Sequence, residues 1–255
     1  MPIQYISLKE ILEKDIAHGG KSALITGKPD SGKTGLLHGL ASRIFENEIC
    51  IFRGLKTGQE FRFPGHLNII AFQCRPKFYD ATGKELDVDL KIINSNYHDL
   101  LKTCVVGKLN VIYFPFEKER GYWVGFARFL IQRFPADYAS SYVSLFMDEA
   151  EDIIPPPEKG KFRDTEAFVG ALKEFRKCLI SFYAVSQQYF DVFWRALGKI
   201  NYRIYLRGSL VPKRISRVHQ ETADSLPLGR GILTGSFFGF FTFGNYPTRK
   251  LVIVR

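Results

Sequence analysis

The chain has 255 residues, of which 45% are hydrophobic and 24% are charged, a balance typical of an ordinary globular protein. No apolar run approaches the roughly 18–20 residues of a membrane span, and no basic segment followed by an apolar stretch opens the chain, so neither a membrane partner nor a signal peptide is expected. The formal net charge of +10 favours a polyanionic partner such as nucleic acid.

The four cysteines are scattered without C-x-x-C spacing, and most lie in or beside apolar segments. This distribution predicts reduced thiols in a cytoplasmic protein and gives no indication of a zinc site.

Near the N-terminus, helical apolar spacing over Ile6–Ile16 is followed by a buried strand at Ser22–Thr26. The next residues read G-x-x-x-x-G-K-[ST], the phosphate-binding P-loop, and a helical pattern follows to about residue 45. Glycines let the backbone N–H groups face phosphate oxygens, Lys33 reaches the β- and γ-phosphates, and the Thr34 hydroxyl ligates Mg²⁺. The sequence therefore predicts an ATP site formed by Gly27, Lys28, Pro29, Asp30, Ser31, Gly32, Lys33, Thr34 and Gly35.

The middle of the chain alternates apolar strands with helical patterns. The region from about 56 to 97 is the least regular, and it is expected to form a small β insertion within a single domain spanning residues 1–255. A helix is predicted over Tyr122–Phe134, ending before a proline. Further strands are predicted at 48–52, 67–72, 88–93 and 109–114.

A second motif lies at Tyr142–Glu149, an apolar run that ends in two carboxylates. A buried parallel strand has this pattern, with its chemistry at the carboxyl end. Asp148 is expected to hold Mg²⁺ together with Thr34, as a Walker-B acid does, and Glu149 to activate the attacking water. The alternative is a solvated acidic cluster, because two more acidic residues follow.

The remaining pattern predicts a helix over Thr165–Lys177, a strand at 179–185 and an antiparallel hairpin in the tail from Gly231 to Val254. Alternating helices and strands indicate a mostly parallel sheet covered on both faces. The aromatic run at 237–243 favours a buried hairpin or an interface over a base-stacking platform. Residues 192–220 contain no acidic side chain but seven cations: Arg195, Lys199, Arg203, Arg207, Lys213, Arg214 and Arg217.

Three later segments follow these motifs in a recognisable order. Ser186-Gln187-Gln188 ends the strand after the Walker-B strand, and the segments Asn201–Leu206 and Leu228–Leu233 come next. In this order the chain resembles the HerA/FtsK superfamily of P-loop ATPases, over roughly residues 21–54 and 109–245. Its size looks most like the DNA-packaging or translocation ATPases of archaeal viruses and plasmids. The resemblance implies an α/β, RecA-like (ASCE) P-loop NTPase fold with a mostly parallel central sheet flanked by helices and a C-terminal antiparallel hairpin.

The same resemblance implies roles for further residues. Gln187 would be the polar sensor of the γ-phosphate, and Arg203 or Arg217 would be an arginine finger acting on the neighbouring subunit. A loop carrying Lys159, Lys161 and Arg163 would face a central pore and hold DNA phosphates, although a solvated loop fits the same residues. The implied function is an ATP-dependent motor that moves duplex DNA through a homo-oligomeric ring, with a hexamer expected.

Two alternatives stay open. A Zot-like ATPase for virion assembly or secretion, acting on protein, has the same P-loop and Walker-B acid. A non-catalytic nucleotide-binding module needs only the P-loop, and Glu149 and Gln187 argue against it because a switch needs no activated water.

Overall fold

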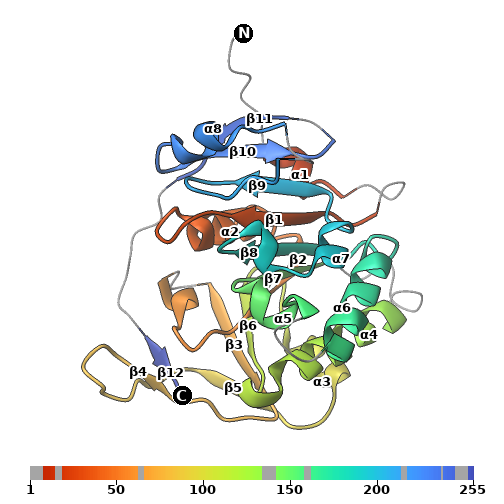
Figure 1. Cartoon of the computed structure of the whole chain (residues 1–255). Helices are drawn as coiled ribbons and strands as arrows, with labels where there is room; N and C mark the ends of the chain where they lie inside the picture. Colours follow the sequence, from red (N-terminus) through yellow and green to blue (C-terminus); the bar gives the residue numbers. More distant parts are fainter. Residues whose placement is uncertain are drawn as a thin grey trace.

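The computed structural model describes residues 8–14, 19–62, 66–133, 142–157, 162–213, 217–236, 238–244 and 252–255. Most strands belong to one ten-stranded sheet with the order β11-β10-β9-β1-β8-β7-β2-β6-β3-β5 (Figure 1). The strands are β1 Ser22–Thr26, β2 Glu48–Arg53, β3 Leu67–Phe72, β4 Phe78–Tyr79, β5 Leu90–Ile93, β6 Leu109–Tyr113, β7 Tyr142–Met147, β8 Ser181–Ser186, β9 Tyr202–Tyr205, β10 Arg230–Thr234, β11 Gly239–Thr242 and β12 Ile253–Val254.

The helices lie between these strands. They are α1 Lys9–Leu12, α2 Lys33–Ala41, α3 Tyr97–Thr103, α4 Glu119–Arg133, α5 Ala150–Ile153, α6 Phe162–Phe175, α7 Trp194–Leu197 and α8 Gln220–Asp224. Short 3₁₀ turns also occur within the described ranges, at η1 Gln59–Arg62, η2 Phe116–Lys118 and η4 Tyr189–Asp191.

The centre of the sheet is the parallel set β9-β1-β8-β7-β2. Strand β8 lies between the P-loop strand β1 and the Walker-B strand β7, which is the order that defines the ASCE type of P-loop NTPase. Because parallel strands point the same way, the carboxyl ends of β1, β7 and β8 meet at one edge of the sheet. The predicted RecA-like fold is confirmed, including the antiparallel hairpin of β10 and β11.

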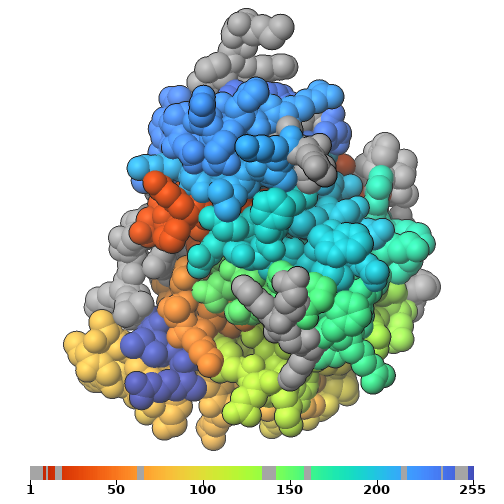
Figure 2. All heavy atoms as spheres, viewed as in Figure 1, coloured from red at the N-terminus to blue at the C-terminus, as the bar shows by residue number. Residues whose placement is uncertain are grey.

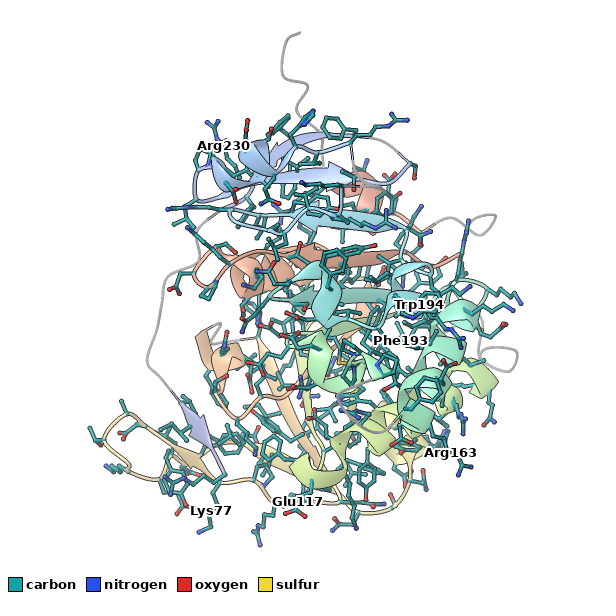
Figure 3. All side chains as sticks on the ribbon, viewed as in Figure 1. Lys77, Glu117, Arg163, Phe193, Trp194 and Arg230 are labelled. Carbon is teal, nitrogen blue, oxygen red and sulfur yellow. The ribbon has the colours of Figure 1, made fainter. Side chains whose placement is uncertain are left out.

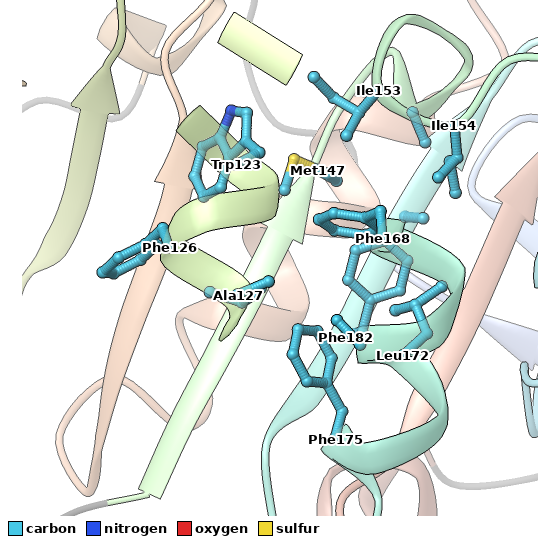
Figure 4. Close-up of a cluster of buried hydrophobic side chains, with 14 of the residues drawn as sticks. Trp123, Phe126, Ala127, Met147, Ile153, Ile154, Phe168, Leu172, Phe175 and Phe182 are labelled. Carbon is cyan, nitrogen blue, oxygen red and sulfur yellow. The ribbon is translucent and has the colours of Figure 1, made fainter. Parts of the chain in front are cut away.

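Two hydrophobic layers enclose the sheet, one on each face. Side chains of α3, α4, α5 and α6 pack on one face, and those of α1 and α2 pack on the other. Figure 4 shows part of the first layer, in which Trp123 and Phe126 of α4 and Phe168 and Phe175 of α6 lie beside Met147 of β7 and Phe182 of β8. Burial on both faces explains why the central strands read as continuous apolar runs without alternation.

Two parts of the chain differ from the sequence-based expectations. The segment 56–97 adds β3 and β5 to the central sheet, and β4 is the one strand in its described part that lies outside that sheet. The tail does not stay in one hairpin: the hairpin ends at β11, and β12 pairs antiparallel with β4. Figure 2 shows the dark blue atoms of this C-terminal strand against the yellow segment that carries β4.

Candidate functional site

The P-loop connects β1 to α2 and is shaped by two glycines. Gly32 has a φ of +90°, a left-handed conformation that favours glycine. A Cβ on Gly27 would lie 2.4 Å from the Ser31 Oγ, so only glycine fits where the loop closes on itself. The Ser31 hydroxyl is buried and has no hydrogen-bond partner among the described residues. The exposed side of the loop is formed by Lys28, Pro29 and Asp30, and Gly35 lies in the first turn of α2.

The Lys33 ammonium points back into the loop. It donates hydrogen bonds to the carbonyl oxygens of Gly27, at 2.7 Å, and Lys28, at 2.9 Å. Burial lowers the pKa of Lys33, while the nearby carboxylates of Asp148 and Glu151 act to raise it. The ammonium therefore occupies the centre of the loop, at the place where a phosphate would supply better acceptors than two carbonyls.

Thr34 and Asp148 meet across the edge of the sheet. The Thr34 Oγ1 donates to the Asp148 Oδ2 at 2.5 Å, although 114 residues separate them in sequence. Burial raises the pKa of Asp148, and the hydrogen bond from Thr34 opposes that rise. A buried carboxylate beside a hydroxyl is a pair of hard oxygen donors, so these two residues fit Mg²⁺. They are the pair expected from the two sequence motifs.

Glu149 is the N-cap residue of the short helix α5 and has a left-handed conformation, with a φ of +52°. Its backbone N–H donates to the Asp148 Oδ1 at 3.0 Å. Burial raises the pKa of its carboxyl, and the neighbouring Asp148 adds to the rise. Glu149 borders a cavity of about 540 Å³, whose lining also includes Arg53, Lys56, Lys118 and Arg120.

Arg53, at the end of β2, fixes the backbone of the Walker-B segment. Its guanidinium is paired with the Glu119 carboxylate at 2.7 and 2.8 Å and with the Asp152 Oδ2 at 2.9 Å. It also donates to the carbonyl oxygens of Asp148, at 3.0 Å, and Glu149, at 2.8 Å. The side chain is only 6% exposed. Although burial acts to lower the pKa of Arg53, hydrogen bonding to Glu119 and the charge of that residue raise it overall.

Neither Arg53 nor Glu119 was identified from the sequence. The sequence does place a lone cation, Arg53, directly after the apolar run of β2. A charge buried at the end of such a strand requires a partner, so this position could have indicated a buried ion pair. The identity of that partner was not readable, since 66 residues separate Arg53 from Glu119.

Gln187 follows β8, between the two motifs. Its carbonyl oxygen accepts a hydrogen bond from the Gly27 N–H at 3.3 Å, and its side chain is exposed. Glu151, in α5, lies close enough to Ser186 and to the backbone of Gln187 for hydrogen bonding to affect its pKa. The structure therefore brings together Lys33, Thr34, Asp148 and the backbone of Gln187.

The two arginines expected as fingers lie in different surroundings. Arg203 is half-buried on β9, beside the P-loop strand, and its guanidinium lies 5.8 Å from the centre of the Tyr189 ring. Arg217 is exposed in the segment before α8.

Of the residues expected to contact DNA, Lys159 and Lys161 lie outside the described residues. Arg163 is exposed in the first turn of α6. Near it, the ring of Phe162 contacts that of Phe193, with centroids 6.1 Å apart, and the next residue, Trp194, is 66% exposed. Figure 3 shows Arg163 and Trp194 on the same side of the molecule.

The C-terminal hairpin reaches the P-loop. A Cβ added to Gly32 would lie 3.1 Å from the Phe243 ring, which follows β11. Phe241 is buried and its ring lies 6.0 Å from that of Phe243. Within the aromatic run Phe241 is therefore packed into the hairpin, whereas Phe238 is exposed and Phe237 lies outside the described residues.

The strand order, the glycine-bounded loop and the Thr34–Asp148 pair define a P-loop NTPase fold of the RecA-like class. Two structures of the genome-packaging NTPase B204 from Sulfolobus turreted icosahedral virus 2 share it. The complex with ATPγS matches with a TM-score of 0.54 at 12% identity, over 88% of this chain and 98% of that one. The complex with sulfate matches with a TM-score of 0.55 at 13% identity, over 89% and 98%.

A third structure, the cytoplasmic domain of the type VII secretion ATPase EccC from Thermomonospora curvata, matches with a TM-score of 0.52 at 16% identity. The match spans 92% of this chain and 27% of EccC. No family model matches the chain, and no curated protein matches its sequence. At these identities the likeness establishes the fold, and it confirms the P-loop ATPase architecture that the resemblance to HerA/FtsK proteins implied.

A match to the N-terminal domain of zonular occludens toxin from Neisseria meningitidis has a TM-score of only 0.39 and gives no reason to prefer the protein-moving alternative. Among the described residues, no helix combines the length and the apolar character that crossing a bilayer requires.

Proposed function

We propose that this chain is an ATPase that uses ATP and Mg²⁺ to move duplex DNA through a ring of its own copies. The observation that carries the proposal is the assembly of Lys33, Thr34 and Asp148 at one edge of the sheet, beside the segment of Gln187. Lys33 and Thr34 follow β1, Asp148 follows β7, and Gln187 follows β8. All three strands are therefore needed to place these groups.

ATP binding follows from the loop itself. Its backbone N–H groups and Lys33 hold the phosphates, and the N-terminus of α2 adds a favourable dipole. Thr34 and Asp148 would hold Mg²⁺, which neutralises charge on the phosphate oxygens when it is bound. Glu149 and the Gln187 side chain would then orient the attacking water.

DNA as the substrate is favoured by charge. The net charge is +10, and exposed cations accompany exposed aromatic rings at the start of α6 and α7. Arg163 lies there, and the Arg195 guanidinium lies 5.2 Å from the centre of the Trp194 ring. Cations that contact phosphates and aromatic faces that contact bases or sugars are the groups with which proteins bind DNA without reading its sequence.

A ring would place an arginine of one subunit at the phosphates of the next. Of the two candidates, Arg217 fits this role better, because it is exposed while Arg203 packs on Tyr189 within its own subunit. A hexamer is the ring size we propose.

The test is ATP hydrolysis by the purified chain with Mg²⁺, with and without linear duplex DNA, over a salt series. We expect duplex DNA to stimulate hydrolysis and the stimulation to fade as salt rises, because phosphate contacts weaken. Lys33→Ala should lose nucleotide binding, whereas Lys173→Ala, at an exposed position of α6, should behave as wild type. Hydrolysis that ignores DNA would favour the Zot-like alternative, and no hydrolysis would favour the non-catalytic module.

A further inference from the structure

Two neighbouring cavities lie around the 3₁₀ turn η2. The first, of about 540 Å³, is the cavity that borders Glu149. The second, of about 680 Å³, reaches the C-terminal strand β12. Among the described residues, Lys56, Phe116, Glu117 and Lys118 line both cavities, so the two form one continuous surface, called the η2 groove below. Glu117 is labelled near the lower edge of the molecule in Figure 3.

The second cavity of the η2 groove has an excess of positive charge. Its described lining includes three exposed cations, Lys56, Lys118 and Arg255, against one carboxylate, that of Glu117. Within the described part of the chain, no ion pair joins Lys56 or Lys118 to a carboxylate. These two ammonium groups are therefore available to an anion from outside the chain.

Local structure restricts where both ammonium groups can lie. The Lys56 Nζ is 5.0 Å from the centre of the Phe116 ring, a cation–π contact inside the groove. The Lys118 N–H donates to the Pro115 carbonyl oxygen at 2.9 Å, which holds the Lys118 backbone in the turn η2. Groups that are partly ordered before a ligand arrives lose less conformational entropy when it binds, so this arrangement favours binding.

Hydrogen bonds connect the η2 groove to the segment that follows the Walker-B strand. Arg120, which lines the first cavity, donates to the Asp152 carbonyl oxygen at 2.7 and 3.0 Å. The Asp152 carboxylate accepts from Arg53, and Arg53 also donates to the Glu149 carbonyl oxygen. A ligand in the groove therefore contacts a wall that is joined to the backbone of the ATP site.

We propose that the η2 groove binds the phosphate backbone of duplex DNA, with Lys56 and Lys118 each contacting a phosphate. The inference rests on the proposed DNA-moving function, and it adds a second contact surface to the one that contains Arg163 and Trp194. Duplex DNA carries a negative charge about every 1.7 Å of its length, so one duplex can reach several cations of the groove at once. Such contacts are independent of base sequence, because the phosphates are the same in every sequence.

The test measures the binding of a fluorescently labelled duplex to the full chain, by anisotropy, over a series of salt concentrations. In the double variant Lys56→Gln/Lys118→Gln, the Kd at about 100 mM salt should rise about tenfold or more. The plot of log affinity against log salt should become shallower by about 2, because each phosphate contact contributes roughly 0.9 to its slope.

A control with the same change in net charge is Lys102→Gln/Lys108→Gln. Both lysines are exposed, and Lys108 precedes β6 whereas η2 follows it, so the control lies at the opposite end of that strand. Its slope should equal that of wild type. The variant Lys56→Arg/Lys118→Arg keeps both charges and should also keep the wild-type slope.

Equal losses in the test and control variants would show that only net charge matters and would overturn the inference. An unchanged slope in Lys56→Gln/Lys118→Gln would overturn it too. If the double variant fails to fold, Lys118→Gln alone should make the slope shallower by about 1. Failure of the wild-type chain to bind duplex DNA would overturn the proposed function as well, whereas wild-type binding that survives the double substitution would overturn only this inference.

Discussion

At the scale of single residues, Arg53 is the side chain on which the shape of the Walker-B segment most depends. Its five hydrogen bonds go to the carboxylates of Glu119 and Asp152 and to the backbone carbonyls of Asp148 and Glu149. Arg53→Ala would leave the buried Glu119 without its cation, and the free energy of unfolding should fall by about 3–5 kcal/mol. Urea denaturation measures this loss. Arg75→Ala, at an exposed position, should change the same quantity by less than about 0.5 kcal/mol, and an equal loss in both variants would contradict the assignment.

Glu60 should make stability depend on pH. It is buried and accepts a hydrogen bond from the Tyr113 hydroxyl. Burial raises its pKa from the ordinary 4.5 to about 8. Below pH 4.5 the carboxyl is protonated in both states. Between pH 4.5 and pH 8 the unfolded chain releases a proton that the folded chain keeps, so the free energy of unfolding falls as pH rises.

Glu60→Gln removes this dependence, since the amide imitates the protonated carboxyl at every pH. We expect the variant to gain stability relative to wild type between pH 5 and pH 8, by about 1.4 kcal/mol for each unit of pKa shift that is realised. Urea denaturation at the two pH values measures the gain. Glu85→Gln, which is exposed, should show none, and a constant difference between wild type and Glu60→Gln across the range would show that Glu60 titrates normally.

The P-loop residues and the Asp148 carboxylate were predictable because phosphate and metal binding require particular residue types in a short stretch of sequence. The backbone conformation around Glu149 was not. It combines a φ of +52° at Glu149 with a hydrogen bond from Arg53, which comes from a distant strand, to the Glu149 carbonyl oxygen. Sequence spacing places Glu149 after Asp148 but says nothing of this long-range contact.

At the scale of elements, the strand β12 ties the tail to β4. The Val254 N–H donates to the Lys56 carbonyl, and the side chains of Val252 and Val254 are buried in the layer that contains α2. Val254→Ala should lower the free energy of unfolding by about 1–3 kcal/mol. Hydrogen exchange should speed up at Phe78 and Tyr79 ahead of the central strands. Uniform exchange changes across β1, β7 and β8 would contradict a local role for this pairing.

The central strands were predicted closely, because burial on both faces leaves apolar runs that are visible in the sequence. The pairing of β12 with β4 was not predictable, since both strands have two residues and their partnership links positions more than 170 residues apart. Helix α3 was also missed. Of its side chains only Leu100 and Leu101 are buried, which leaves too short an apolar pattern for a helical period to show.

At the scale of the whole molecule, a ring predicts that two defective variants can repair each other. Arg217→Ala should lower kcat by about 1,000-fold and leave nucleotide affinity unchanged, because the arginine acts on the next subunit. Lys33→Ala should lose nucleotide binding. When the two variants are mixed, some interfaces join an intact P-loop to an intact Arg217, and part of the hydrolysis should return. Turnover by the mixture equal to the sum of the separate variants would contradict action between subunits.

The position of β8 has a consequence for how such a chain can diverge. Ala184 of β8 is in register with Leu24 of β1 on one side and with Met147 of β7 on the other, so it links the three central strands. A single inserted or deleted residue in β8 would turn its side chains to the opposite face and shift Gln187 away from both motifs at once. Length changes should therefore accumulate in surface segments such as 80–89 and be rejected between 181 and 187. Homologous chains that differ at most positions would still be expected to keep this one interval constant in length.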